Sequence, residues 1–170
     1  GKYKNTTGSA LCKDCGTAKY SAEVAAETES VCTVCPDAAS SPPGSTVLVH
    51  CQCNEGYTGA DGGPCDACIP GTYKAGAGTA QCVACAAGKY LEHAAAISQS
   101  ECVSCVENSH SEPGSANATD CSCNAGYTGS DGGPCVACVA GKYKPSPGSS
   151  ACLACDVGKF SGAEAETNAS

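Results

Sequence analysis

The sequence contains no tryptophan, no methionine and no arginine, and it has a single phenylalanine, Phe160. Leu, Ile, Val and Phe together make up 18 of the 170 residues, well below the roughly 20% under which a charged chain tends to stay disordered. Such a chain cannot bury enough apolar surface to offset the conformational entropy lost on folding. The composition therefore excludes a large hydrophobic core, and folding requires another source of stability.

Long apolar runs and basic clusters are also missing. The longest run of Val, Leu, Ile and Phe is Val47–Val49, whereas a membrane-spanning helix needs about 20 apolar residues. All nine basic residues are lysines, and the net charge is −8. These properties predict no membrane span in this segment and no nucleic-acid partner.

Cysteine is abundant, and its positions repeat every 70 residues. The first eight cysteines are followed by eight more at the same spacing, and a third copy begins with Cys152 and Cys155. The two copies are Cys12, Cys15, Cys32, Cys35, Cys51, Cys53, Cys65 and Cys68, and then Cys82, Cys85, Cys102, Cys105, Cys121, Cys123, Cys135 and Cys138. Such regularity indicates a repeat protein stabilised by disulfides. Disulfides on this scale need an oxidising compartment, so the sequence predicts a secreted or cell-surface location.

We therefore expect a small disulfide-rich fold built from tandem cysteine-rich modules that form an elongated rod. The expected repeat units are 1–70 and 71–140, with the start of a third unit at 141–170. The Gly-, Ala-, Ser- and Pro-rich loops predict little regular secondary structure and short β-hairpins. Only Ser21–Ser30 has the composition of a short helical turn, and Val47–Val49 is long enough for at most a short strand. The repeated aromatic rings are expected to cover neighbouring disulfides.

Zinc is the main alternative explanation for the cysteine doublets. Cys12-x-x-Cys15 followed by Cys32-x-x-Cys35 has the spacing of a four-cysteine zinc site. The unbroken series of doublets favours disulfides instead. A thioredoxin-like redox site would need a C-x-x-C at a helix start in a βαβ fold, which the sequence does not indicate.

Calcium binding and catalysis have less support. Asp61 and Asp131 precede Gly-Gly, where an aspartate more often closes a turn, and calcium needs six or more oxygen ligands. His50, His93 and His110 are replaced by Asp, Glu and Ser in the other copy, and no Ser-His-Asp set is recognisable. We expect no cofactor, no metal and no enzymatic activity.

Three Asn-x-Ser/Thr motifs make Asn5, Asn117 and Asn168 candidate N-glycosylation sites. Because the composition leaves no core to hide these loops, we expect sugar on at least one of them. Ser40–Thr46 and Pro145–Pro147 are candidates for O-linked glycans on compositional grounds.

Two local motifs resemble known extracellular modules. Cys-x-Cys-Asn-x-Gly-Tyr-Thr-Gly followed by a further cysteine, at 51–65 and 121–135, resembles the C-terminal half of an EGF-like module. The Gly-x-Tyr-x(8)-Cys-x-x-Cys segments resemble the first loop of tumour-necrosis-factor-receptor cysteine-rich domains. Together they resemble ephrin-receptor-like cysteine-rich repeats, as found in tandem in large surface proteins of algae and other protists. This resemblance implies an extracellular, non-catalytic protein.

The resemblance also implies a disulfide ladder. An EGF-like final loop would join Cys53 to Cys65, and a receptor-like first loop would join Cys68 to Cys82. Extension along the chain then adds Cys15–Cys32, Cys35–Cys51, Cys85–Cys102, Cys105–Cys121, Cys123–Cys135 and Cys138–Cys152. A crossed pairing, with Cys12–Cys32 and Cys15–Cys35, stays open on spacing alone.

The ladder leaves Cys12 and Cys155 without partners in these 170 residues. The 70-residue period places their partners three residues before Gly1 and two residues after Ser170. We therefore expect the sequence to be part of a longer repeat array, with both cysteines bonded to residues outside it.

The near-identity of the copies favours a structural role: a non-catalytic segment of a glycosylated extracellular fibre, appendage or surface coat. Its partners would be copies of itself or neighbouring repeats. The alternative is a stalk or ligand-binding ectodomain of a cell-surface receptor or adhesin. The sequence has no Trp or Arg of the kind that anchors a typical binding hot spot.

Overall fold

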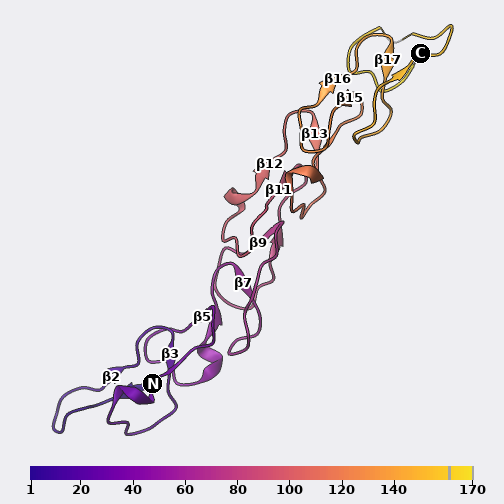
Figure 1. Ribbon diagram of the computed structural model, residues 1–170. Helices are drawn as coiled ribbons and strands as arrows, with labels where there is room; N and C mark the ends of the chain where they lie inside the picture. Colours follow the sequence, from indigo (N-terminus) through magenta and orange to yellow (C-terminus); the bar gives the residue numbers. More distant parts are fainter. Residues whose placement is uncertain (161, 170) are drawn as a thin grey trace. The chain divides into compact units, whose positions relative to one another are not determined.

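The computed structural model describes residues 1–160 and 162–169. Its regular structure consists of nine two-stranded hairpins and four single turns of 3-10 helix within these residues (Figure 1). The hairpins pair β1 (Lys2–Tyr3) with β2 (Lys13–Asp14), β3 (Lys19–Tyr20) with β4 (Thr33–Val34), β5 (Ala39–Ser40) with β6 (Gln52–Cys53), β7 (Tyr57–Thr58) with β8 (Asp66–Ala67), β9 (Thr72–Tyr73) with β10 (Val83–Ala84), β11 (Lys89–Tyr90) with β12 (Val103–Ser104), β13 (Ser109–His110) with β14 (Ser122–Cys123), β15 (Tyr127–Thr128) with β16 (Val136–Ala137), and β17 (Lys142–Tyr143) with β18 (Leu153–Ala154). The predicted disulfide-rich modules with short hairpins are confirmed.

Most cysteine doublets contain a strand. In seven of the nine hairpins the second strand consists of the two residues between the cysteines of a C-x-x-C doublet, as β10 does between Cys82 and Cys85. Side chains alternate between the faces of a strand, so residues three apart point to opposite sides. The two cysteines of a doublet therefore bond to different parts of the chain and not to each other.

The structure contains eight disulfides, each of which joins the second cysteine of one doublet to the first cysteine of the next. They are Cys15–Cys32, Cys35–Cys51, Cys53–Cys65, Cys68–Cys82, Cys85–Cys102, Cys105–Cys121, Cys123–Cys135 and Cys138–Cys152. Most of these sulfurs are buried, and the only other buried apolar side chains in the described residues are Ala39, Leu91 and Ala96. Cystine thus takes the place of the missing hydrophobic core.

A 3-10 turn precedes four of the cysteines. These turns are η1 (Glu29–Val31), η2 (Leu48–His50), η3 (Gln99–Glu101) and η4 (Ala118–Asp120). The N–H of the cysteine that follows each turn donates to its first carbonyl, as Cys51 does to Leu48 at 2.9 Å. Val47–Val49, for which the sequence allowed at most a short strand, forms no strand, because Leu48 and Val49 lie in η2. Of the helical turn considered for Ser21–Ser30, only the start of η1 is present.

Aromatic rings cover disulfides in part. Tyr20 packs against the buried cluster of Cys35, Cys51 and Ala39, which confirms the expectation at this position. Phe160, at the equivalent position of the third copy, is 69% exposed. Its position has no comparable packing in the described chain.

The third loop of each copy, at 37–45 and 107–115, has no aromatic residue, and a buried serine stabilises it instead. The hydroxyl of Ser41 donates to the carbonyl of Lys19 at 2.8 Å, and Ser111 donates to Lys89 at 2.9 Å. Both serines are at most 4% exposed. A satisfied hydroxyl is therefore compatible with burial here.

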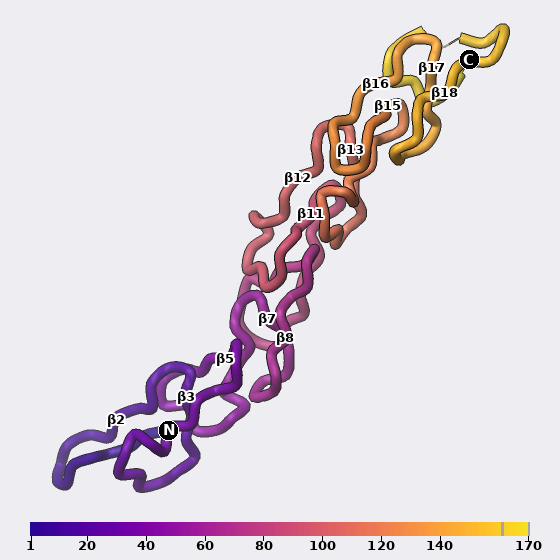
Figure 2. Tube along the Cα trace, viewed as in Figure 1, coloured from indigo at the N-terminus to yellow at the C-terminus, as the bar shows by residue number. Residues whose placement is uncertain are grey.

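The chain divides into two compact units. The first comprises 1–68, 73–83 and 95–97, and the second comprises 69–72, 84–94 and 98–170. Each unit contains hairpins of the same kind, such as β7 with β8 in the first and β15 with β16 in the second, which Figure 2 shows along the trace. The 70-residue domain boundaries stay a prediction.

Glycines at one repeat position give a first testable prediction. Gly71 and Gly141 have φ angles of 84° and 83°, a region in which a side chain costs roughly 1–2 kcal/mol. A Cβ at Gly71 would also overlap the carbonyl oxygen of Gly114, whereas a Cβ at Gly141 meets no described atom within 4 Å. We expect Gly71→Ala to destabilise its hairpin by at least about 1 kcal/mol more than Gly141→Ala does.

Native-state hydrogen exchange measures this difference at two matched amides. The N–H of Cys85 donates to the carbonyl of Gly71 at 2.8 Å, and that of Cys155 donates to Gly141 at 3.1 Å. Each variant is compared with the unsubstituted chain at its own amide. Equal losses of protection in the two variants would contradict the expected overlap.

Candidate functional site

Two buried lysines form the centres of matching polar sites. Lys74 follows β9 directly and is only 2% exposed. Its ammonium group donates to the carbonyl of Tyr57 at 2.7 Å, with longer hydrogen bonds to Asn54 at 3.3 Å and Cys53 at 3.4 Å. A buried ammonium is tolerated only when such acceptors replace water. Lys74 thereby fastens the Cys-Asn-x-Gly-Tyr-Thr-Gly loop to the hairpin that follows it.

Lys144 occupies the same repeat position in the second unit. It is 1% exposed and donates to the carbonyl of Tyr127 at 2.7 Å and to that of Gly148. Tyr127 is the counterpart of Tyr57 one period later. Lys74 and Lys144 therefore hold the equivalent loop against the equivalent hairpin in the two units.

Backbone contacts around each lysine are also repeated. Three backbone N–H groups donate to backbone carbonyls: Gly56 to Lys74 at 2.9 Å, Gly78 to Cys53 at 2.8 Å, and Ala95 to Cys68 at 2.8 Å. The equivalent bonds in the second unit run from Gly126 to Lys144, from Gly148 to Cys123 and from Ala165 to Cys138. We call this set of contacts, with the central lysine and the disulfide Cys68–Cys82 or Cys138–Cys152, the junction.

Local backbone geometry explains the residue types at the junction. A Cβ on Gly56 would overlap the carbonyl oxygen of Ala95, and a Cβ on Gly126 would overlap that of Ala165. Ala95 and Ala165 adopt φ angles of 58° and 59°, which are uncommon for residues other than glycine. Only glycine allows the loop to approach so closely.

The electrostatics of the junction are set by burial. Burial lowers the pKa of Lys74 below its ordinary value, while the carboxylates of Asp61 and Glu55 oppose this shift. Burial likewise lowers the pKa of Lys144, opposed by Asp131. In addition, one carboxylate oxygen of Asp61 is buried without a hydrogen-bond partner in the described chain. Asp61 and Asp131, considered from the sequence as turn or calcium residues, thus lie where they act on the junction lysines.

The sequence analysis missed these lysines. Their signal was present, because Lys4, Lys74 and Lys144 recur at the 70-residue period and each follows a tyrosine. Lysine is rarely buried, so composition suggested a solvent-exposed residue. Of the residues singled out from the sequence, the disulfide cysteines Cys68, Cys82, Cys138 and Cys152 and the aspartates Asp61 and Asp131 lie at the junctions.

The remaining candidates are dispersed over the described residues. Cys12 is exposed and Cys155 half-buried, and both are free thiols. His93 lies 3.3 Å from a carboxylate oxygen of Glu101, whereas His50 accepts a hydrogen bond from the backbone N–H of Thr46. Within 1–160 and 162–169, three or more His, Cys, Asp or Glu side chains do not gather in a way that would hold a metal ion.

The eight disulfides of the structure have the pairing expected from the ladder. Peptide mapping tests this pairing chemically. Proteolysis of the native, non-reduced protein with thiols blocked should yield a peptide in which Cys15 is linked to Cys32. The crossed pairing would instead yield Cys12 linked to Cys32. The equivalent peptides of Cys85 and Cys102 provide an internal control, because they lie one period later.

All three sequon asparagines have exposed side chains, which suits glycosylation. Asn117 is also the N-cap residue of η4, and Asn168 corresponds by the period to Ser98, which caps η3. Asparagine is a favoured N-cap, so a structural role accounts for Asn117 as well. The third residue of the Asn168 motif, Ser170, lies outside the described residues.

We still expect N-linked sugar on at least one of the three asparagines in protein from its natural source. Enzymatic deglycosylation in heavy-oxygen water should convert an occupied asparagine to a labelled aspartate, detected by mass spectrometry. Asn54 and Asn124 lack the motif and serve as unlabelled controls. Absence of label at Asn5, Asn117 and Asn168 would refute the prediction.

Comparison with known proteins identifies a family whose sequence profile matches this chain. The sequence profile described as tyrosine-protein kinase ephrin type A/B receptor-like matches residues 56–102 and 126–170, more than half of the chain. Both matches begin at the glycine of a junction and include its lysine. A search of curated proteins found no match.

The cysteine-rich repeats of this family are a non-catalytic ectodomain type, and with the disulfides they indicate an extracellular location. The described residues include no helix long and apolar enough to span a bilayer. The chain belongs to the tyrosine-protein kinase ephrin type A/B receptor-like family of cysteine-rich repeats.

Proposed function

We propose that the chain is a structural segment of a glycosylated extracellular fibre, appendage or surface coat. One observation carries this proposal: the two complete junctions use the same lysine, the same glycine and the same backbone hydrogen bonds. Repeat proteins built from such identical contacts extend by adding units, without any new type of interface. Disulfides would give such a segment resistance to proteolysis without a large core.

Surface composition agrees with this role. The large exposed apolar side chains in the described residues include many aliphatic residues scattered along the chain, such as Leu11, Val24 and Ile69, besides the run Val47–Val49 and the aromatic Phe160. Interaction hot spots are usually built from Trp, Tyr and Arg; the chain has seven Tyr but neither Trp nor Arg. Contacts with copies of itself or neighbouring repeats would then be made mainly by backbone and small side chains.

Family membership favours a second candidate, the stalk or ligand-binding ectodomain of a cell-surface receptor or adhesin. The two candidates differ in the state of the native material. A fibre component would be found in filaments, and a receptor stalk would be dispersed on the membrane.

Immunogold electron microscopy of the native cell surface, with antibodies against residues 1–170, tests the proposal. We expect gold on filaments or a continuous coat, at a regular spacing along each filament. Pre-immune serum is the control. If the native protein is extracted as a dispersed monomer that binds a soluble partner through one loop, the receptor alternative is correct. The elongated rod expected from the sequence stays a prediction, which small-angle X-ray scattering of the purified chain would test.

A further inference from the structure

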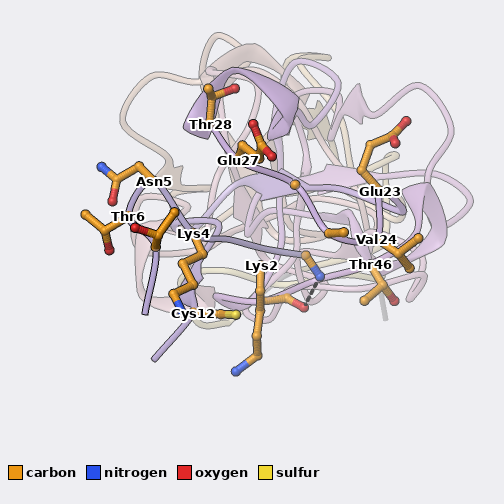
Figure 3. A pocket seen from close by; sticks show the side chains of 15 residues that line it. Lys2, Lys4, Asn5, Thr6, Cys12, Glu23, Val24, Glu27, Thr28 and Thr46 are labelled. Atoms are coloured by element: carbon orange, nitrogen blue, oxygen red, sulfur yellow. Dashed lines mark hydrogen bonds between the residues drawn. The ribbon is translucent and has the colours of Figure 1, made fainter. Parts of the chain in front are cut away.

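A groove of about 870 Å³ lies at the first copy of the junction position, within the first unit. Figure 3 shows Lys4, Asn5 and Cys12 on one part of its wall and Val24 and Thr46 on another. Lys4 corresponds by the 70-residue period to Lys74 and Lys144, and Cys12 to Cys82 and Cys152. The groove is therefore built from the residues that surround the junction lysine in the other two copies.

Its framework already has the geometry of a complete junction. The N–H of Lys4 donates to the carbonyl of Ala26 at 2.8 Å, as that of Lys74 does to Ala96 at 3.0 Å. Ala25 has a φ angle of 55°, against 58° for Ala95. The unusual backbone angle is thus present in the groove even though no loop contacts it there.

Within the described residues, the groups that contact the loop in the complete junctions lack that contact in this one. Within the described residues, no acceptor is bonded to the N–H of Gly8 or Ala25, the counterparts of Gly78 and Ala95. Lys4 is half-buried, and among the described residues its ammonium group donates only to the carbonyl of Gly8. Cys12 is an exposed free thiol.

Burial shows how much the loop covers at a complete junction. Gly78 is buried and Lys74 is 2% exposed, whereas Gly8 is exposed. Ala96 is 1% exposed, whereas its counterpart Ala26 is half-buried. The groove is thus a preformed surface of backbone donors, an ammonium group and a thiol.

We propose that this groove is the acceptor site for the Cys-Asn-x-Gly-Tyr-Thr-Gly loop of a preceding copy of the repeat on the same polypeptide. That loop supplies what the groove lacks: carbonyl acceptors for Lys4, Gly8 and Ala25. Its glycine approaches the carbonyl of Ala25, where any side chain would overlap. The site holds whether the native assembly is a fibre or a receptor stalk.

A preceding loop also brings a cysteine to Cys12. In the complete junctions the bonded cysteine lies three residues before the glycine that starts the next hairpin, as Cys68 does before Gly71. Gly1 is the counterpart of Gly71. Oxidation of the incoming thiol and the Cys12 thiol forms one disulfide, and glutathione disulfide is reduced to two molecules of glutathione in the same exchange.

A grafted chain tests the proposal. A copy of residues 122–140 is placed directly before Gly1, which reproduces the natural sequence at the joint because Gly1–Lys4 and Gly141–Lys144 both read Gly-Lys-Tyr-Lys. After refolding in a glutathione redox buffer, we expect Cys12 to be linked to the grafted copy of Cys138, with Cys155 still free. We also expect the acetylation rate of Lys4 to fall at least tenfold relative to exposed Lys13.

Two variants of the graft distinguish non-covalent binding of the loop in the groove from formation of the disulfide with Cys12. With Cys138→Ser in the grafted copy, amide exchange at Gly8 and Ala25 should still slow at least tenfold. With Gly126→Val added in that copy, this protection should disappear, because the side chain cannot pass the carbonyl of Ala25.

The proposal is overturned if Cys12 stays free and Lys4 reacts as fast as in the ungrafted chain. It is equally overturned if the serine variant gives no protection. Should the grafted chain fail to fold, the peptide 122–140, closed by Cys123–Cys135 and carrying Cys138→Ser, is added to the natural chain. Chemical-shift changes confined to the groove are then expected, and their absence at millimolar peptide rejects the site.

Discussion

Reduction of the eight disulfides is expected to abolish the folded structure of the whole chain. Each disulfide closes a loop of 12 to 17 residues in sequence separation, and a loop of about 15 residues contributes roughly 3 kcal/mol in the chain-entropy description. Eight of them contribute on the order of 20 kcal/mol, more than the 5–15 kcal/mol by which domains are typically stable. The few buried Leu and Ala side chains do not offset this loss.

Amide hydrogen exchange before and after reduction and alkylation measures the effect. Backbone N–H groups at the junctions, such as those of Gly56 and Gly126, should lose all protection. Protein treated with the alkylating reagent but without reductant is the control, and should keep its protection. Amide protection that persists after complete alkylation would contradict this expectation, because it would mean that non-covalent contacts alone hold the fold.

Replacement of the junction lysines by methionine is expected to have the next largest effect. Lys74→Met keeps the aliphatic stem but removes the ammonium donor from the carbonyl of Tyr57. The carbonyls of Cys53 and Asn54 lose the same donor but keep backbone N–H donors from Gly78 and Tyr57. A buried acceptor left unsatisfied costs about 1–3 kcal/mol. We expect a loss of at least about 2 kcal/mol in local opening free energy, and a similar loss for Lys144→Met.

Lys4→Met provides the matched control in the chain of 170 residues. Lys4 occupies the same repeat position, but within the described residues its ammonium group donates only to the carbonyl of Gly8. Its replacement should therefore cost about 0.5 kcal/mol or less, as surface substitutions usually do. Hydrogen exchange of Gly56 N–H, which donates to the carbonyl of Lys74 at 2.9 Å, measures the first junction. A cost for Lys4→Met equal to that for Lys74→Met would contradict the role assigned to the carbonyl acceptors.

The same lysines predict a pH dependence. Because burial lowers the pKa of Lys74 and Lys144 in the folded state, the unfolded chain binds more protons between the folded value and 10.5. Stability therefore rises as the pH increases through this window. The double Lys→Met variant should lack this rise, which short hydrogen-exchange measurements at matched pH values would detect.

The repeat and the hairpins could be predicted from the sequence because they depend on local spacing. Cysteines three apart in an extended segment must bond in different directions, and Gly-rich segments must turn. For Val47–Val49 the sequence allowed at most a short strand, whereas in the structure the N–H of Cys51 closes a 3-10 turn onto the carbonyl of Leu48. Three residues carry too little periodicity for the sequence to distinguish these conformations.

By itself, the sequence determined the class of this protein: cysteine spacing with so few apolar residues leaves disulfides as the main source of stability. Only the tertiary structure decided that Lys74 and Lys144 are buried, because their carbonyl partners come from loops about 20 residues earlier in the chain. The burial of a charge depends on acceptors that replace water. The residues next to a lysine in the sequence do not indicate whether such acceptors will surround it. For the same reason, the sequence did not predict the groove at Lys4.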